Sequence, residues 1–417
     1  MKISRDDLLH RLLPILCSQA LGLACGLVGI QLTSRWVSPA DYGSYGVFSS
    51  LATVGASVIF AGLVKFISRH WQTATDRPGL LRELAVATAR RSLWLVVAAA
   101  VVTWFFAPSH RLAYCALLFG SALLLTITQL AQSALQAARE HWRDFGVGAG
   151  VSVTRSFLPP LLYTTSGLGL SALLVGFLGQ ALLGALLGSA QVARWWPRSS
   201  HLPVARQLTA AYEGPRFIAL AVASWILLGV NRWLVASFFG AEVAGYFTLA
   251  SNIGTILPAM LGFALLQFVQ PTWFAATPRD DAERRQLARE VDKVALGYAG
   301  LGLGVTTALH LAMPLLIGTL VSARYASAAS FVLASGCWSV AATTGLFYHA
   351  MMLAAKREES SSAADLGGAA FLIVGSIAAA TAGVEYFKGW LLAAPLVPWI
   401  LNRPLARRAV FRVPDPQ

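Results

Sequence analysis

The sequence has 417 residues, of which 56% are hydrophobic and only 12% charged, and its mean hydropathy is +0.62. Soluble globular proteins carry about a quarter charged residues, so this composition excludes an ordinary soluble domain. The formal net charge is +13, which could suggest a nucleic-acid-binding protein. The basic residues, however, stand in short clusters between apolar runs, as membrane topology and anionic lipid headgroups require. The sequence therefore indicates a membrane protein that does not bind nucleic acid.

Apolar runs of roughly 20 residues recur along the whole chain, and each is long enough to cross a hydrocarbon layer about 30 Å thick. They do not alternate with a period of two, so they predict helices rather than the strands of a barrel. We expect no cleaved signal peptide, because Asp6 and Asp7 precede a first run that continues past signal length. We predict twelve spans, at 11–35, 44–69, 92–108, 112–137, 144–163, 168–192, 214–237, 244–270, 293–320, 326–352, 363–384 and 386–402.

The Lys and Arg residues are distributed unevenly between the two sides of these spans. If the N-terminus is cytoplasmic, most of the 32 basic residues lie in cytoplasmic segments. Three fall within spans, and the opposite side holds only Arg35, Arg111, Arg324 and Lys388. The positive-inside rule therefore predicts that both termini are cytoplasmic.

The four cysteines all fall within predicted spans and lack the spacing of a metal site. Such residues usually act as small apolar side chains in a membrane protein of this composition. We therefore expect neither a metal ion nor a cofactor. The cysteines are Cys17, Cys25, Cys115 and Cys337.

Two stretches that lie 202 residues apart resemble each other, "WVSPADYGSYGVFSSL" at 36–51 and "FFGAEVAGYFTLASNI" at 238–253. In this register Gly43 falls on Gly245 and Trp71 on Trp273. The repeat places the first two spans over the seventh and eighth, which predicts two six-helix lobes of equal orientation. Parallel repeats of this kind are related by a pseudo-two-fold axis along the membrane normal. We therefore predict an all-α polytopic fold of about twelve helices, with an N-terminal lobe at 1–192, a cytoplasmic amphipathic linker at 193–213 and a C-terminal lobe at 214–417.

The repeated turn has a structural interpretation. Pro39 fixes φ and ends the preceding helix, while Gly43 permits a close backbone approach or a positive φ. We therefore interpret the repeat as a duplicated hairpin rather than a duplicated site.

The same turn carries a family resemblance. It resembles the small turn between the first two spans of polysaccharide (lipid-linked oligosaccharide) flippases, through Ser38, Pro39, Asp41, Gly43 and Tyr45. These proteins belong to the multidrug/oligosaccharidyl-lipid/polysaccharide exporter superfamily, which also contains multidrug and toxin extruders. The second copy of the turn, and the stretch "SARYASAASFVLASG" at 322–336, resemble further elements of the family. The resemblance covers most of the chain but assigns no substrate contacts, so the candidates below come from polar residues within spans.

Two arginines within the spans are the first candidates for a site, because charged groups inside a bilayer are costly. Arg155 lies near the middle of the fifth span, before Pro159 and Pro160, which we expect to break the helix. Its planar guanidinium could bind the diphosphate of a lipid carrier, or it could pair with polar groups of a neighbouring helix. Arg232, beside Asn231, lies nearer the outer end of the seventh span, where snorkelling is the alternative.

Uncharged polar residues and one lysine complete the predicted substrate-binding set. Gln129, Gln132 and Gln136 share one face of the fourth span, where amides could hydrogen-bond to sugar hydroxyls or to another helix. Gln19 in the first span is a similar candidate. Lys65 stands about one turn from the cytoplasmic end of the second span, where snorkelling is the alternative to a binding role.

No carboxylate lies near the middle of a predicted span, although a drug/proton antiporter usually needs one. The resemblance and this distribution together favour a flippase, a transporter and not an enzyme, of the bacterial inner membrane. It would move undecaprenyl-diphosphate-linked oligosaccharide outward by alternating access, for surface polysaccharide biosynthesis. The expected partners are this lipid-linked substrate, membrane lipids and other membrane proteins of polysaccharide assembly. The alternatives are a cation-coupled exporter of drugs or amphiphiles with the same fold, and a membrane glycan polymerase or ligase, which the short outer loops disfavour.

Overall fold

The computed structural model describes residues 5–60, 62–71, 77–106, 111–195, 215–275, 280–355 and 358–411. Within these ranges the regular structure is helical, apart from one isolated bridge between Ile317 and Val321. Six of the described helices are by themselves long and apolar enough to cross a membrane. The predicted all-α polytopic fold is thereby confirmed.

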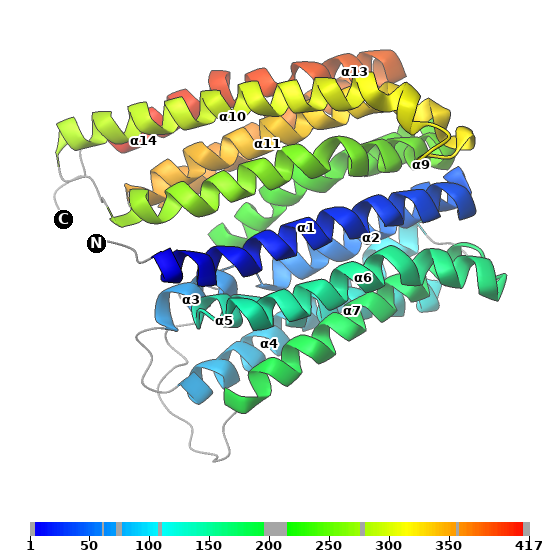
Figure 1. Ribbon diagram of the computed structural model, residues 1–417, viewed down its shortest axis with the longest axis horizontal. Helices are drawn as coiled ribbons and strands as arrows, with labels where there is room; N and C mark the ends of the chain where they lie inside the picture. Colours follow the sequence, from blue (N-terminus) through cyan, green and yellow to red (C-terminus); the bar gives the residue numbers. More distant parts are fainter. Residues whose placement is uncertain are drawn as a thin grey trace. The chain divides into compact units, whose positions relative to one another are not determined.

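The N-terminal half of the chain forms seven described helices that follow the first six predicted spans (Figure 1). The predicted second span divides at Gly62, whose φ of 79° is in the left-handed region. The predicted third span is longer than expected, because its helix already begins at Arg77. The helices are α1 (Arg5–Trp36), α2 (Pro39–Phe60), α3 (Leu63–His70), α4 (Arg77–Phe106), α5 (Arg111–Ala137), α6 (His141–Ser166) and α7 (Leu170–Val192).

Pro159 and Pro160 do not break the fifth span, so that expectation was wrong. Both lie inside α6, which continues to Ser166. Helices in a membrane tolerate proline where neighbouring helices support the altered backbone. The backbone of Pro159 lies so close to Gly176 of α7 that a Cβ on this glycine would stand 2.5 Å from the Pro159 Cα.

In the C-terminal half, α9 (Pro215–Ala275) contains the seventh and eighth predicted spans, which meet at a kink at Gly240 with φ 87°. The predicted last span is also broken, into α13, a 3₁₀ turn and a π turn. A short amphipathic helix, α14, follows it and was not predicted. The elements are α10 (Asp281–Leu316), η2 (Ala323–Ala328), α11 (Ala329–Ala354), α12 (Glu358–Ala382), α13 (Val384–Ala393), η3 (Ala394–Leu396), η4 (Pro398–Asn402) and α14 (Arg403–Phe411).

The chain divides into two compact units, which we call the first and the second unit. The first contains residues 1–37 and 47–222, and the second contains residues 38–46 and 223–417. The start of α2 therefore belongs to the second unit, although the helix continues into the first. Of the predicted linker at 193–213, only the turn η1 (Ala193–Trp195) is described; the remainder lies outside the described residues.

Small residues bring the helices of the first unit close together. The helix α6 packs between α1 and α7, and α7 also packs along α5 (Figure 1). Ser156 of α6 faces Gly29 of α1, and Thr128 of α5 faces Gly184 of α7. Such contacts are the usual basis of helix association in a bilayer, where hydrophobic burial gives little preference.

Aromatic residues fill the core of the second unit, where α10 packs along α11 (Figure 1). Phe347 is completely buried and contacts the rings of Tyr298 and Trp273, with ring centroids 5.4 Å and 6.5 Å away. Ala406 and Val410 of α14 are buried in the same cluster. The short last helix is therefore part of this core.

The two copies of the repeated turn contact each other within the second unit. Ser38 caps α2, because its Oγ accepts a hydrogen bond from the backbone N–H of Asp41 at 3.2 Å. A Cβ on Gly43 would lie 1.9 Å from the carbonyl oxygen of Ala241, and a Cβ on Gly245 would lie 1.9 Å from that of Pro39. The close backbone approach expected at Gly43 is thus confirmed, and it is reciprocal.

Candidate functional site

A polar face in the first unit joins α5, α6 and α1. The Nε2 of Gln136 donates a hydrogen bond to the Asp144 carboxylate at 2.9 Å. One turn later on α6, Gly148 leaves room for the Gln132 amide and the Ser18 hydroxyl, which would stand 3.6 Å and 3.7 Å from a Cβ at that position. Gln132 also forms a side-chain hydrogen bond with Asp144, so the structure brings two of the predicted glutamines to one carboxylate.

Arg155 continues this face along α6. Spacings of four and seven residues place Asp144, Gly148 and Arg155 on one side of the helix, with Asp144 and Arg155 about 16 Å apart along the axis. The Arg155 side chain is exposed, and none of the described residues forms a hydrogen bond or an ion pair with it. The structural pairing that was the alternative interpretation is therefore not seen among the described residues.

The other predicted residues of the first unit remain separate from this contact. Gln129 is exposed and Gln19 half-buried, and among the described residues neither forms a side-chain hydrogen bond. Lys65 lies on α3, but its side chain is outside the described residues.

In the second unit, Arg232 is part of a chain of three polar residues. Its Nη2 donates to the Oδ1 of Asn252 at 3.0 Å, and the Nδ2 of Asn252 donates to the Tyr42 hydroxyl oxygen at 2.7 Å. Tyr42 is 6% exposed, stacks on Tyr45 and contacts the ring of Tyr325 edge-on. Arg232 is half-buried and directed to this network, so its side chain is held by the protein.

Asn231, the predicted site residue that precedes Arg232 in the sequence, is directed toward α12 instead. It is 5% exposed, and its Oδ1 accepts a long hydrogen bond of 3.5 Å from Ser376 of α12. This contact joins α9 to α12, which is the role of a helix-packing residue rather than of a ligand.

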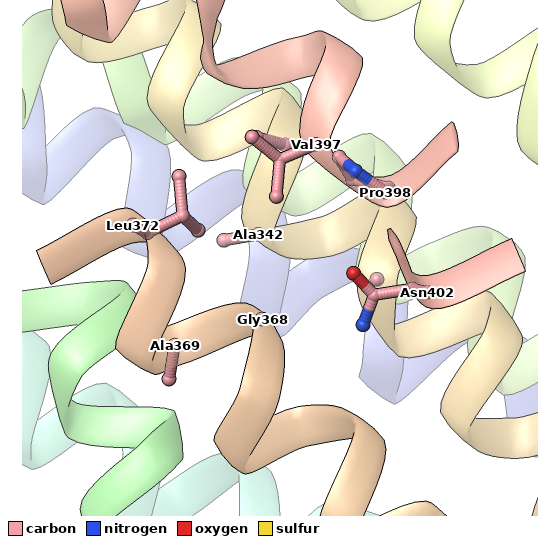
Figure 2. A pocket seen from close by; sticks show the side chains of 9 residues that line it. Ala342, Gly368, Ala369, Leu372, Val397, Pro398 and Asn402 are labelled. Carbon is pink, nitrogen blue, oxygen red and sulfur yellow. The ribbon is translucent and has the colours of Figure 1, made fainter. Parts of the chain in front are cut away.

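A small pocket in the second unit is enclosed by α11, α12 and the segment from Val397 to Asn402 (Figure 2). It has room for roughly one water molecule. Asn402, which is 8% exposed, points toward Gly368 as the one polar side chain among the residues that line the pocket. The pocket is too small for a sugar or a diphosphate, and no predicted site residue lines it.

A charged cluster lies where the extramembrane start of α10 meets α14. Asp292 accepts hydrogen bonds from Arg403 at 2.9 Å and from Arg407, and also from the hydroxyl of Tyr348 at 3.0 Å. Burial raises the pKa of the Asp292 carboxyl, but the bonds from Arg403 and Tyr348 and the charges of both arginines outweigh it and leave this pKa below its usual value. The cluster fixes α14 to α10 and α11.

Several of these residues were missed by the sequence-based prediction. Asp144 stands at the start of its apolar run, and Tyr42 lies in the turn that was interpreted as structural only. The signal for Asp144 was its spacing from Arg155 on one helical face. Tyr42 had no such signal, because its partner lies 210 residues away. Among the described residues, no group of three or more His, Cys, Asp or Glu side chains could hold a metal ion.

The fold matches that of solved membrane transporters. It is similar to a MATE multidrug resistance transporter of the MOP superfamily in an inward-facing conformation, with a TM-score of 0.60 and 14% identity over 94% of this chain and 93% of that one. The Lipid II flippase MurJ, in an inward closed conformation, gives a TM-score of 0.62 and 14% identity over 96% and 87% of the two chains. A Vibrio cholerae MATE transporter, VcmN, gives a TM-score of 0.58 and 16% identity, with 96% of each chain covered. The chain therefore shares the fold of these multi-pass membrane proteins.

Residues 32–330 match the family described as polysaccharide biosynthesis protein. The chain belongs to this family, which agrees with the resemblance found in the repeated turn. No curated protein matches the chain in sequence.

Proposed function

We propose that the protein is a flippase that moves undecaprenyl-diphosphate-linked oligosaccharide across the bacterial inner membrane by alternating access. Both termini would be cytoplasmic. The family and the fold support a transporter of lipid-linked precursors, and a Lipid II flippase is among the proteins with a similar fold. The predicted lobes at 1–192 and 214–417, with the linker at 193–213, would be the two moving parts.

The observation that carries the proposal is the position of Arg155. An arginine midway along an apolar helix costs on the order of 3 kcal/mol on insertion scales, so it requires a compensating interaction. None of the described residues provides one. A diphosphate is a suitable partner, because guanidinium groups bind phosphate oxygens through paired, charge-assisted hydrogen bonds.

The polar face around Arg155 would serve the glycan. Gln129, Gln132 and Gln136 provide amide donors and acceptors along α5, without the desolvation cost of further charges. We therefore assign the diphosphate to Arg155, and we keep Arg232 of the second unit as a separate candidate for the substrate. We assign the sugars to the amides, while the prenyl tail remains in the lipid.

Complementation in cells tests this function. Cells that lack a known flippase for undecaprenyl-linked glycan would receive the wild-type chain, the Arg155→Ala variant or the Arg155→Lys variant. We expect the wild type to restore surface glycan, and Arg155→Ala to accumulate the lipid-linked precursor at a normal protein level. Arg155→Lys should restore part of the signal, because it keeps the charge but loses the paired geometry. Failure of the wild type with several glycans would contradict the proposal.

Asp144 favours a second candidate function, a cation-coupled exporter of the same fold. Its Oδ1 is buried and has no hydrogen-bond partner among the described residues, and a carboxylate in this state could bind a cation. Resistance to cationic dyes, present in the wild type and lost in Asp144→Asn, would support this function. We rank it second because Asp144 lies at the end of its helix, whereas Arg155 lies in the middle.

A further inference from the structure

We propose that Arg403 and Arg407 form a binding site for the phosphate of an anionic phospholipid in the second unit. The site lies at the charged cluster around Asp292, on the side of the membrane that is predicted to be cytoplasmic. It contains none of the residues assigned to the transported substrate, so the inference does not depend on the proposed function.

One carboxylate in this cluster faces two guanidinium groups. Arg403 donates from Nε to Oδ1 of Asp292 at 3.0 Å and from Nη2 to Oδ2 at 2.9 Å, which is the paired geometry of a complete arginine–carboxylate ion pair. Arg407 donates from Nη2 to the same Oδ2, and the Tyr348 hydroxyl donates to Oδ1 at 3.0 Å. Among the described residues, no other carboxylate pairs with either arginine. The single charge of Asp292 balances one arginine, so one positive charge is left over.

Both guanidinium groups keep donors for a further ligand. The Nη1 atoms of Arg403 and Arg407 form no hydrogen bond with any described residue, and neither atom is buried. The two side chains are 39% and 42% exposed. Because both Nη2 atoms contact one carboxylate oxygen, the two groups lie side by side, and one phosphate could accept bonds from both. The ion pair of Arg403 is enough to fix α14 to α10, so Arg407 is available for this task.

Exposed apolar residues place this site at the edge of the apolar layer. On α10 the exposed side chains change from Lys293 to Leu296 within about one turn after Asp292. On the neighbouring element, the exposed Ile400 stands three residues before Arg403. In a membrane protein such apolar side chains face the hydrocarbon, and lipid phosphates lie just outside it. Two elements therefore put the hydrocarbon boundary within about one helical turn, or roughly 5 Å, of the two arginines.

The position and the charge together favour an anionic phospholipid over other phosphates. A phospholipid carries its phosphate at this depth, and its acyl chains would lie along the exposed Leu296 and Ile400. The positive charge that is left over favours a headgroup with a net negative charge, because a zwitterionic headgroup brings its own cation. A free phosphate has the same oxygen atoms but no chains to cover the apolar side chains.

The experiment measures lipid binding to the purified full-length protein by native mass spectrometry. The probes are phosphatidylglycerol and phosphatidylcholine, which share the phosphate and differ in net charge. We expect the wild type to bind phosphatidylglycerol in preference. Arg407→Lys should weaken this binding about 3- to 10-fold, because the charge remains while the planar fork of donors is lost. Arg407→Gln should weaken it about 10-fold or more, because the charge is lost as well.

Arg408 provides a matched control on the same helix. It is exposed, and none of the described residues forms a hydrogen bond or an ion pair with it. Arg408→Lys keeps the charge outside the site, so it should leave the affinity unchanged. Neither variant of Arg407 removes the pair of Arg403 with Asp292, so both should fold, and their melting temperatures without lipid check this. If Arg407→Gln does not fold, Arg407→Lys alone decides.

Three results would overturn the inference. Equal losses for Arg407→Lys and Arg408→Lys, or no loss for Arg407→Lys, would show that lipid responds only to the overall charge of α14. Equal binding of phosphatidylglycerol and phosphatidylcholine to the wild type would show that the charge left over attracts no anion. Displacement of phosphatidylglycerol by inorganic phosphate at an equal concentration would assign the site to a soluble anion instead of a lipid.

Discussion

The two membrane arginines of the predicted site lie in contrasting surroundings. Arg155 in the first unit is exposed and forms no polar contact with any described residue. Arg232 in the second unit is half-buried and hydrogen-bonded to Asn252, which is in turn fixed by Tyr42. Both residues are arginines in apolar helices, and the sequence places Arg155 near the middle of its span and Arg232 nearer the outer end. Under the proposed function, Arg155 would meet its partner only in the complex, whereas the Arg232 side chain is already held by the protein.

The largest effect should follow the removal of Arg155. We expect Arg155→Ala to weaken binding of a prenyl diphosphate by about 10- to 100-fold, because it removes two charge-assisted hydrogen bonds. Arg232→Ala should weaken it less. Calorimetry at two salt concentrations would check this, because binding through either charge falls as salt rises. If Arg155→Ala binds as the wild type does, Arg155 does not contact the diphosphate and the comparison between the two sites no longer holds.

The next effect concerns the support of the Arg232 network. Gly43→Ala would place a methyl group within 1.9 Å of a backbone oxygen, and overpacking of this kind costs about 1–3 kcal/mol or more. We expect a melting temperature lower by several degrees. Gly22→Ala is the matched control in α1, since no atom lies within 4 Å of its Cβ position. It should be neutral or slightly stabilising, because alanine favours a helix over glycine by up to about 1 kcal/mol. Equal melting temperatures for the two variants would show that the turn copies do not pack as described.

A smaller effect is expected at Asp292. Its pKa in the folded protein lies below the ordinary value of about 3.9, so its stabilising contribution is complete above that value and is lost as the pH falls through the lowered pKa. Asp292→Asn should therefore lower the melting temperature by the same few degrees at every pH between about 6 and 8, and the difference should shrink only below about pH 4. Thermal unfolding over a pH series checks this. A difference that changes near neutral pH would mean that another group titrates in the cluster.

The smallest effects are expected along α5. Gln129→Ala should change transport by less than about 5-fold, since one neutral hydrogen bond contributes about 1 kcal/mol. Gln136→Ala should have a larger effect, because it leaves the Asp144 carboxylate without its amide donor at 2.9 Å. The amount of surface glycan in complemented cells is the measurement for both variants. A larger loss in Gln129→Ala than in Gln136→Ala would place the sugar contacts away from Asp144.

The sequence allowed the fold to be predicted to a large extent, because apolar run length and basic flanks have a direct physical meaning in a membrane. Prediction from the sequence failed where packing between helices overrides the local conformational preference of a residue. Pro159 continues α6 because α7 approaches it through Gly176, and this cannot be read from the local stretch. Asp292 lies just before the predicted ninth span, and its arginine partners follow 111 and 115 residues later.

The candidate site was predicted in part. Gln132, Gln136 and Arg155 share a polar face because helical spacing determines which residues lie together on α5 and α6. Spacing gave no information on Asn231, which bonds to Ser376, or on Tyr42, which reaches Arg232 through Asn252. These contacts depend on which helices are neighbours. A single sequence does not contain that information except through the repeat.

The reciprocal contact of Gly43 and Gly245 bears on how a duplicated chain can change over generations. After a duplication, most positions are free to diverge, because a substitution in one copy need not be matched in the other. At this contact the copies meet, and a side chain gained by either glycine would collide with the backbone of the other copy. Neither glycine can therefore be replaced by a larger residue on its own. The similarity between the two copies of a repeat should persist longest at the positions where the copies contact each other.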